Sequence, residues 1–216
     1  MKSDTLKTKL ITQYMEQVLE HEAYPKSVYK FCKTAKIEEK DFYNVFSSLD
    51  AVREYVWEVF FTNAMQVLEK DKDFKKGSRR EKLLSFYFTF FEVLLLNRSY
   101  VLFALKREMN IMKDLVFLKR LRLHFKVFAT DLIEEGNADK DSRWSQHPPK
   151  LFSEAAWAQL LFLMKFWIED TSEQFEKTDA AIEKSVNTAF DVFDNTPLDT
   201  LLDFGKFLWK ETVANT

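Results

Sequence analysis

SVYKFCKTAKIEEKDFYNVF, residues 27–46, contains two short helical patterns separated by a turn. The first helix carries apolar residues three and four positions apart, which places them on one face. These apolar residues are Val28, Phe31, Cys32 and Ala35. The turn falls at residues 36–37, and residues 40–46 give the second helix. Such a pair is typical of a helix-turn-helix, whose second helix enters the major groove of DNA.

The composition of the whole chain predicts an all-α fold. Among 216 residues there are only three Gly and four Pro, so few segments are interrupted by residues that break helices. The hydrophobic share of 46%, with 22 Phe and 5 Trp, is enough for a large core. A β-sandwich or barrel would need many more turn residues.

The helical periodicity extends along the chain from the opening motif and predicts nine or ten helices. Residues 47–50, Ser-Ser-Leu-Asp, are interpreted as a cap at the start of a long helix. Residues 69–82 and 136–149 are charged or rich in turn residues and are predicted as loops. The predicted helices are 4–22, 28–35, 40–46, 49–69, 83–96, 99–135 with a break near 110–114, 151–175, 178–193, and a last one that begins at Thr196-Pro197. This order predicts a helix-turn-helix domain at 1–48 and a larger helical bundle at 49–216.

Charge and cysteine content favour a soluble cytoplasmic protein. The formal net charge is −2, which excludes a generally basic nucleic-acid binder. Cys32 is the only cysteine, so no disulfide can form within the chain. The longest apolar run, residues 83–96, contains Glu92 and is shorter than the roughly 20 residues of a membrane span. We therefore expect no stable membrane insertion, and the first residues lack the apolar core of a signal peptide.

Residues 27–52 resemble the DNA-binding motif of the TetR family of bacterial regulators. Ile37 stands at the family's apolar position after the turn, Phe42, Tyr43 and Phe46 match its apolar-Tyr-x-x-Phe signature, and Ser48 matches its helix-capping serine. The stretch from Phe166 to Asp194 resembles the C-terminal domain of a TetR subgroup found in Bacteroidetes. The resemblance implies that double-stranded operator DNA is the partner. The residues that it assigns to DNA are Ser27 and Tyr43 at phosphates, and Lys36, Lys40, Asp41 and Asn44 in the groove.

The motif departs from the family in its turn and its charge. Lys36 stands where the family usually has Gly, so the turn must form without glycine's easy positive φ, and Leu49 replaces a common Lys. Residues 26–46 hold five lysines against three acids, a net charge of +2, although affinity for DNA comes largely from neutralised phosphates. Glu38 and Glu39 are interpreted as acids favoured at the positive end of the helix, and Glu38 can also accept a hydrogen bond from cytosine N4.

Aromatic residues recur at helical spacing in the larger domain. Ordinary core packing explains them, and so does a pocket for a small apolar effector or lipid, because pockets between helices are mostly apolar. The candidate pocket residues are Phe86, Phe90, Phe103, Trp157, Phe162 and Phe166, with Trp167 beside them. In TetR relatives a ligand in this domain changes the spacing of the two DNA-binding heads. The resemblance thus implies a repressor whose DNA binding is relieved by the effector.

The resemblance also implies a homodimer through the helices near 151–175 and 178–195. Small residues on these helices would allow close approach of two subunits: Ala155, Ala156, Ala158, Ala180, Ala181 and Ala189. Two recognition helices would then lie about one DNA turn apart.

Two alternatives stay open. A lipid- or quinone-binding protein that has kept the TetR fold but lost DNA reading is favoured by Lys36, Leu49 and the low charge of residues 26–46. An interaction module could instead use the acidic segment 129–216, which contains 17 acidic and 8 basic residues.

Catalytic and metal-binding patterns are absent from the sequence. His21, His124 and His147 have no partner at metal-ligand spacing, and Cys32 is interpreted as a packing residue. Because no nucleophile or phosphate-loop motif occurs either, we expect neither an enzyme nor a cofactor.

Overall fold

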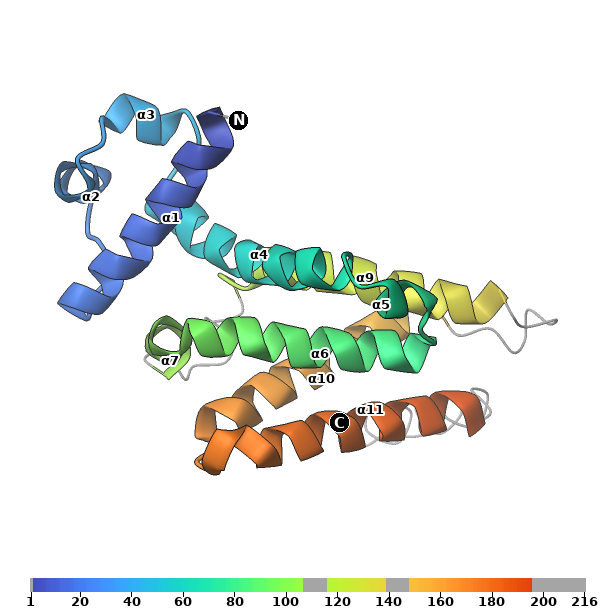
Figure 1. The fold of residues 1–216 in the computed structure, drawn as a ribbon. Helices are drawn as coiled ribbons and strands as arrows, with labels where there is room; N and C mark the ends of the chain where they lie inside the picture. The colour runs from blue at the N-terminus through green and yellow to red at the C-terminus, as the bar shows by residue number, and fades with distance from the viewer. Residues whose placement is uncertain (1, 107–115, 139–147, 196–216) are drawn as a thin grey trace, which may run out of the picture. The chain divides into compact units, whose positions relative to one another are not determined.

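Every secondary-structure element in the described part of the chain is helical, as predicted. The computed structural model describes residues 2–106, 116–138 and 148–195. These contain ten α-helices and one 3-10 helix (Figure 1). The elements are α1 (Lys2–His21), α2 (Val28–Ala35), α3 (Glu39–Tyr43), α4 (Leu49–Leu68), α5 (Lys72–Lys76), α6 (Arg79–Leu96), α7 (Arg98–Lys106), α9 (Lys119–Ala138), α10 (Pro149–Glu169), η2 (Glu173–Phe175) and α11 (Glu176–Asn195).

Two compact units divide the chain. Unit 1 comprises Met1–Lys70 and Thr89–Phe125, and unit 2 comprises Asp71–Phe88 and Lys126–Thr216. Helices α6 and α9 therefore each contribute residues to both units. The boundary at residue 48 concerns function rather than compactness, and it stays a prediction.

Helices α1, α2 and α3 gather at the N-terminal end of α4 within unit 1 (Figure 1). Edge-to-face contacts join Tyr14 to Phe31 and Phe31 to Phe42, with ring centroids 6.1 and 5.9 Å apart. The Gln17 side-chain amide donates to the Phe31 carbonyl oxygen at 3.2 Å, which satisfies a polar group inside this core. The apolar periodicity of the opening sequence therefore corresponds to a real core.

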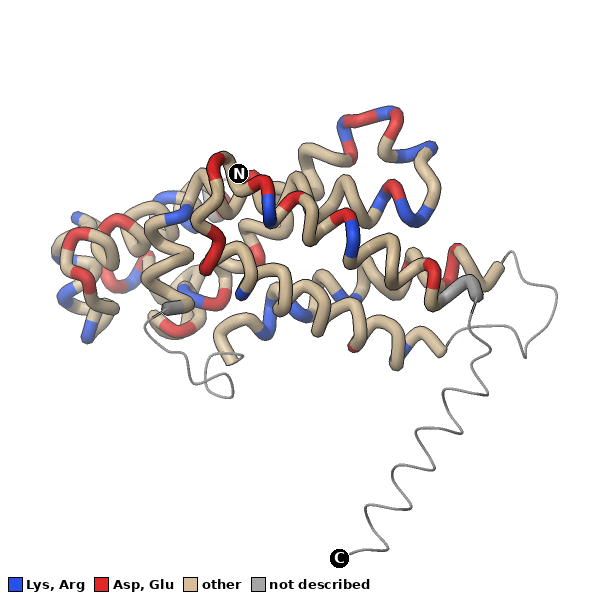
Figure 2. The backbone as a smooth tube through the Cα atoms, turned by 90° about the horizontal axis from the view of Figure 1, so that it is seen from below, with Lys and Arg blue, Asp and Glu red and all other residues tan. Residues whose placement is uncertain are grey.

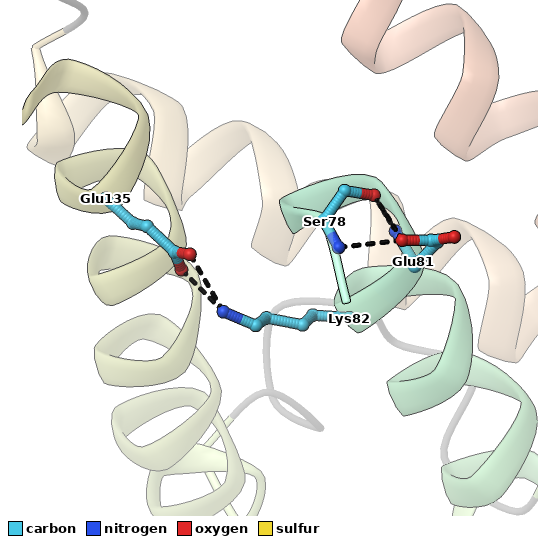
Figure 3. Close-up of polar contacts among 4 residues, drawn as sticks. All are labelled: Ser78, Glu81, Lys82 and Glu135. Carbon is cyan, nitrogen blue, oxygen red and sulfur yellow. Dashed lines mark hydrogen bonds and ion pairs between the residues drawn. The ribbon is translucent and has the colours of Figure 1, made fainter. Parts of the chain in front are cut away.

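Serine residues cap the N-terminal ends of two long helices, α4 and α6. Ser48 caps α4 through its hydroxyl, which accepts a hydrogen bond from the Ala51 amide at 3.1 Å. Ser78 and Glu81 form a reciprocal capping box at the start of α6 (Figure 3). The Ser78 hydroxyl and the Ser78 amide both donate to the Glu81 carboxylate, each at 2.7 Å, and these two hydrogen bonds lower the pKa of the exposed Glu81 carboxyl. Lys82 directly follows Glu81 on α6, and its amine lies 2.8 Å from the carboxylate of Glu135 on α9 (Figure 3).

Two element boundaries differ from the sequence-based expectation. Residues 69–82 are expected to be a helix end and loop, but Asp71 caps the short helix α5 by accepting from the Asp73 amide at 2.8 Å. Helix α9 continues to Ala138, so the loop expected from residue 136 begins later. The expected break at 110–114 and the last helix from Thr196 lie outside the described residues.

The helix expected at 151–175 ends early, at Glu169, and the cap expected at Thr178-Asp179 lies inside α11. Asp170 causes both differences. Its carboxylate accepts hydrogen bonds from the amide and hydroxyl of Ser172 at 2.8 and 2.6 Å. It also accepts from the amide and hydroxyl of Thr178 at 2.9 and 2.6 Å. The chain therefore turns between α10 and α11 around one buried side chain.

One described helix, α10, has the length and apolar composition of a membrane span. Helices α6 and α7 pass the same test only together, and they are bent by 92° relative to each other. Core helices of proteins that never enter a membrane share this composition, so it is weak support for insertion.

Candidate functional sites

The turn of the helix-turn-helix is closed by a lysine in the left-handed conformation. Lys36 has φ 52° and ψ 50°, a region that favours glycine. The Ile37 amide then reaches back to the Cys32 carbonyl oxygen at 3.0 Å, as in a common helix-ending motif. The family-like turn thus forms here without glycine, at a cost in backbone strain.

The residues predicted to contact DNA are mostly exposed, as a binding surface requires. Lys36, Lys40, Asp41 and Asn44 are exposed, and the Tyr43 side chain is 55% exposed. Ser27 is half-buried because its hydroxyl caps α2, accepting from the Lys30 amide at 3.3 Å. A serine hydroxyl that accepts one hydrogen bond can still donate another, so Ser27 remains available to a phosphate.

Helix α3 is shorter than the predicted 40–46. It ends at Tyr43, and Asn44 is its C-terminal capping residue. Glu38 is the N-terminal capping residue but makes no side-chain capping hydrogen bond. Its carboxylate is exposed, so the interpretation of the acids as helix caps is limited to their charge at the positive end of the helix. Acidic and basic positions are interspersed along the chain (Figure 2).

Cys32 is buried in the core beneath this surface. Burial raises the pKa of its thiol, and the negative charge of Glu39 raises it further. A thiol held protonated in this way is a poor nucleophile. Among the described residues, no group of three His, Cys, Asp or Glu side chains is placed to hold a metal ion.

Unit 2 contains an open apolar pocket with a volume of about 510 Å³. Residues of α6, α9, α10 and α11 form its walls, and most of them are aliphatic or aromatic. The lining residues are Arg79, Leu83, Ala129, Leu132, Ile133, Phe152, Ala155, Ala156, Gln159, Phe162, Ala181, Lys184, Ser185, Thr188, Ala189 and Phe190. Its size lies in the range of about 300–1,000 Å³ that is typical of small-molecule sites.

A chain of hydrogen bonds crosses the pocket wall from α6 to α11. The Tyr87 hydroxyl donates to the Gln159 side-chain oxygen at 3.2 Å, and the Gln159 amide group donates to the Ser185 hydroxyl at 3.0 Å. Ser185 in turn donates to the Ile182 carbonyl oxygen at 3.1 Å. Burial raises the pKa of Tyr87 far above its usual range, so this hydroxyl stays protonated and can act as the donor.

Comparison with known proteins identifies the family. Residues 82–208, more than half of the chain, match the family described as "Tetracyclin repressor-like, C-terminal domain". The chain belongs to the TetR family of transcriptional regulators.

A solved structure supports the same fold over a longer part of this TetR family member. The crystal structure of a protein assigned as a TetR-family transcriptional regulator, from Syntrophomonas wolfei strain Goettingen, superposes with a TM-score of 0.65. The identity is 15%, and the similarity covers 89% of this chain and 97% of the other. At that identity, the similarity concerns the fold. No curated protein matches the sequence.

The six aromatic residues predicted to line a TetR effector pocket are not brought together in one place. Phe162 lines the pocket of unit 2, and its ring centroid lies 6.2 Å from that of Phe166. Phe86 and Trp157 are buried in unit 2, whereas Phe90 and Phe103 belong to unit 1. Trp167 is also buried. Small residues such as Ala155 and Ala181 line the pocket, whereas from the sequence they are expected to allow the close approach of two subunits.

Two basic residues at the start of α9 in this TetR chain pair with acids on α4. Within unit 1, Lys119 lies 2.6 Å from Glu54, and Arg120 lies 2.7 Å from Glu58. Both glutamates sit on α4, and their side chains are only 11% and 17% exposed. Charge complementarity thus joins α4, which follows the helix-turn-helix directly, to the start of α9.

The helices predicted to form the dimer leave apolar side chains exposed. On α10 these are Leu151, Ala155, Ala158 and Phe162, which recur at intervals of three and four residues. Leu151 is 50% exposed and Phe162 55% exposed. An exposed apolar stripe of this kind commonly marks an interface, although the homodimer itself stays a prediction.

Proposed function

We propose that this TetR family member is a DNA-binding transcriptional repressor that acts as a cytoplasmic homodimer. The observation that carries the proposal is the exposure of Lys36, Lys40 and Tyr43 on a helix-turn-helix with a buried aromatic core. Asp41 and Asn44 are exposed on the same short helix and its end. The lysines supply phosphate neutralisation, and Asn44 supplies a side chain that can recognise adenine.

The pocket of unit 2 supports the proposal that an effector relieves DNA binding. Ala155 and Phe162 line this pocket, and both also belong to the exposed stripe of α10 that is proposed to meet the partner subunit. A ligand that repositions α10 would therefore change the geometry of the dimer. By linkage, DNA and effector would then weaken each other's binding by the same factor.

A fluorescence anisotropy titration tests the DNA-binding proposal. The protein is titrated against the DNA upstream of its own gene and against a scrambled duplex, at several salt concentrations. We expect preference for the upstream DNA and affinity that falls steeply with salt. Lys40→Gln should weaken binding to both duplexes. It should also reduce the slope of log affinity against log salt by about 1 for each phosphate that the lysine no longer neutralises.

The matched control for that experiment is Lys75→Gln, which removes an exposed lysine of the short helix α5, away from both the helix-turn-helix and the proposed dimer helices. It should leave DNA affinity unchanged. Failure of the wild-type protein to bind either duplex at low salt would contradict the proposal. It would favour the second candidate function, a TetR-fold protein that binds a lipid or quinone without DNA. The apolar pocket of unit 2 and the exposed Glu38 at the start of α3 support that candidate.

A further inference from the structure

We propose that the pocket of unit 2 binds an amphiphilic anion, a single alkyl chain with a carboxylate head held by Arg79 and Lys184. The inference rests on the proposed function for its biological meaning, because it names the class of the effector. The site itself is argued from the pocket alone.

The lining of the pocket favours an alkyl chain as the body of the ligand. Alanine, leucine and phenylalanine side chains from four helices make up most of the walls, including Leu83, Leu132, Phe152 and Phe190. Such walls offer apolar contact and few hydrogen bonds, so a ligand with many polar groups would lose hydration without compensation.

The polar groups deep in the wall are already satisfied by one another. Gln159 receives a hydrogen bond from Tyr87 and donates one to Ser185, and Ser185 donates to a backbone carbonyl. These groups therefore do not require a polar partner in the middle of the ligand. The lining groups that remain for polar recognition are the hydroxyl of Thr188 and the two cationic side chains, of which only the cations favour a charged head.

Arg79 and Lys184 have no acidic partner within the described part of the chain, in contrast to three other basic residues of unit 2. Arg80 donates to Asn187 and Asp191, both at 3.1 Å, and Lys82 is paired with Glu135. Lys126 is paired with Glu154. Among the residues that the structure describes, neither Arg79 nor Lys184 forms an ion pair, and no acidic side chain lines the pocket. Two unpaired cations at an apolar pocket favour a ligand with a negative head.

A glycine in α9 leaves room for the guanidinium of Arg79. A Cβ atom at Gly136 would overlap one terminal nitrogen of Arg79, so any larger residue would displace that group. Glycine inside a helix costs about 1 kcal/mol relative to alanine. The buried Gly136 therefore leaves the space that the Arg79 guanidinium occupies beside the pocket.

Three probes with the same alkyl chain and different heads test the inference: decanoate and decyltrimethylammonium, each below its micelle concentration, and decanol below its solubility limit. Isothermal titration calorimetry with the full chain measures their dissociation constants in the absence of DNA. We expect decanoate to bind at least about tenfold more tightly than decanol, since a hydrogen bond to a charged group contributes enough for that difference. The cation should bind more weakly than either.

Variants locate the carboxylate. Arg79→Gln and Lys184→Gln should each raise the dissociation constant of decanoate about tenfold and leave that of decanol unchanged. Gly136→Ala should act like Arg79→Gln although it removes no charge. Arg80→Gln is the matched control because that neighbouring arginine is held by Asp191 and Asn187, and it should leave the preference for decanoate intact.

Equal binding of decanoate and decanol, or a decanoate affinity insensitive to Arg79→Gln and Lys184→Gln, would overturn the inference. None of these readouts depends on DNA. The inference can therefore fail while the anisotropy titration succeeds, and the reverse outcome is equally distinguishable.

Discussion

At the scale of single residues, Lys36 combines two demands that oppose each other. Its φ of 52° lies where a side chain other than glycine is strained, yet its amine is exposed where DNA is proposed to bind. Glycine would relax the backbone but remove the charge. A lysine at this turn therefore lowers the stability of the helix-turn-helix relative to glycine, but it places a cation beside the recognition helix.

Lys36→Gly should raise the free energy of unfolding by about 1 kcal/mol relative to Lys36→Ala, as measured by urea denaturation. Both variants lose the same charge, so the comparison isolates the backbone. Both should also weaken DNA binding to a similar extent. If the glycine variant were no more stable than the alanine variant, strain at this turn would be refuted.

At the scale of elements, Asp170 sets the boundary between α10 and α11. Burial raises the pKa of its carboxyl, but hydrogen bonds from the side chains and amides of Ser172 and Thr178 outweigh burial and lower the pKa from 3.8 to about 2. A carboxyl whose pKa is lowered by folding stabilises the fold above its ordinary pKa. That stabilisation is lost as the pH falls from about 4 towards 2.

Asp170→Asn should lower the free energy of unfolding by about 1–2 kcal/mol at neutral pH, since the amide can satisfy fewer of the donors. The difference from the wild-type protein should shrink in denaturation experiments as the pH approaches 2. Glu169→Gln, at the exposed neighbouring position, is the control and should have little effect at any pH. A pH-independent difference would argue against the ionised carboxylate as the cause.

The same element shows how far sequence alone predicts this protein. Apolar periodicity predicted the long helices, and the match of residues 27–52 to a known motif predicted the helix-turn-helix. The turn at Asp170 was missed because the helical pattern continues through Phe175, and only the hydrogen bonds to Thr178 reveal that the chain bends. The pocket lining was missed for a similar reason. Large aromatic side chains such as Phe86 are packed in the core, whereas the open volume of the pocket lies beside small alanine side chains.

At the scale of the whole molecule, the exposed stripe on α10 is the proposed seam of a homodimer. Ala158→Arg would place a charge in its centre and should yield a particle near the chain mass of 25.7 kDa, where the wild-type protein should have twice that mass. Light scattering at micromolar concentration measures this, and DNA affinity should fall in parallel. Asn63→Arg, an exposed position of α4, should leave the dimer intact. A monomeric wild-type protein would contradict the seam.

The buried Cys32 makes local opening of the helix-turn-helix measurable in the intact molecule. Cys32 is the chain's only thiol, and it lies in the core shared by α1, α2 and α3. A thiol reagent can modify it only after this part of the protein opens, so the rate of modification reports the free energy of that opening, without an introduced label. The DNA-binding elements thus carry their own probe of whether they open separately from the rest of the chain.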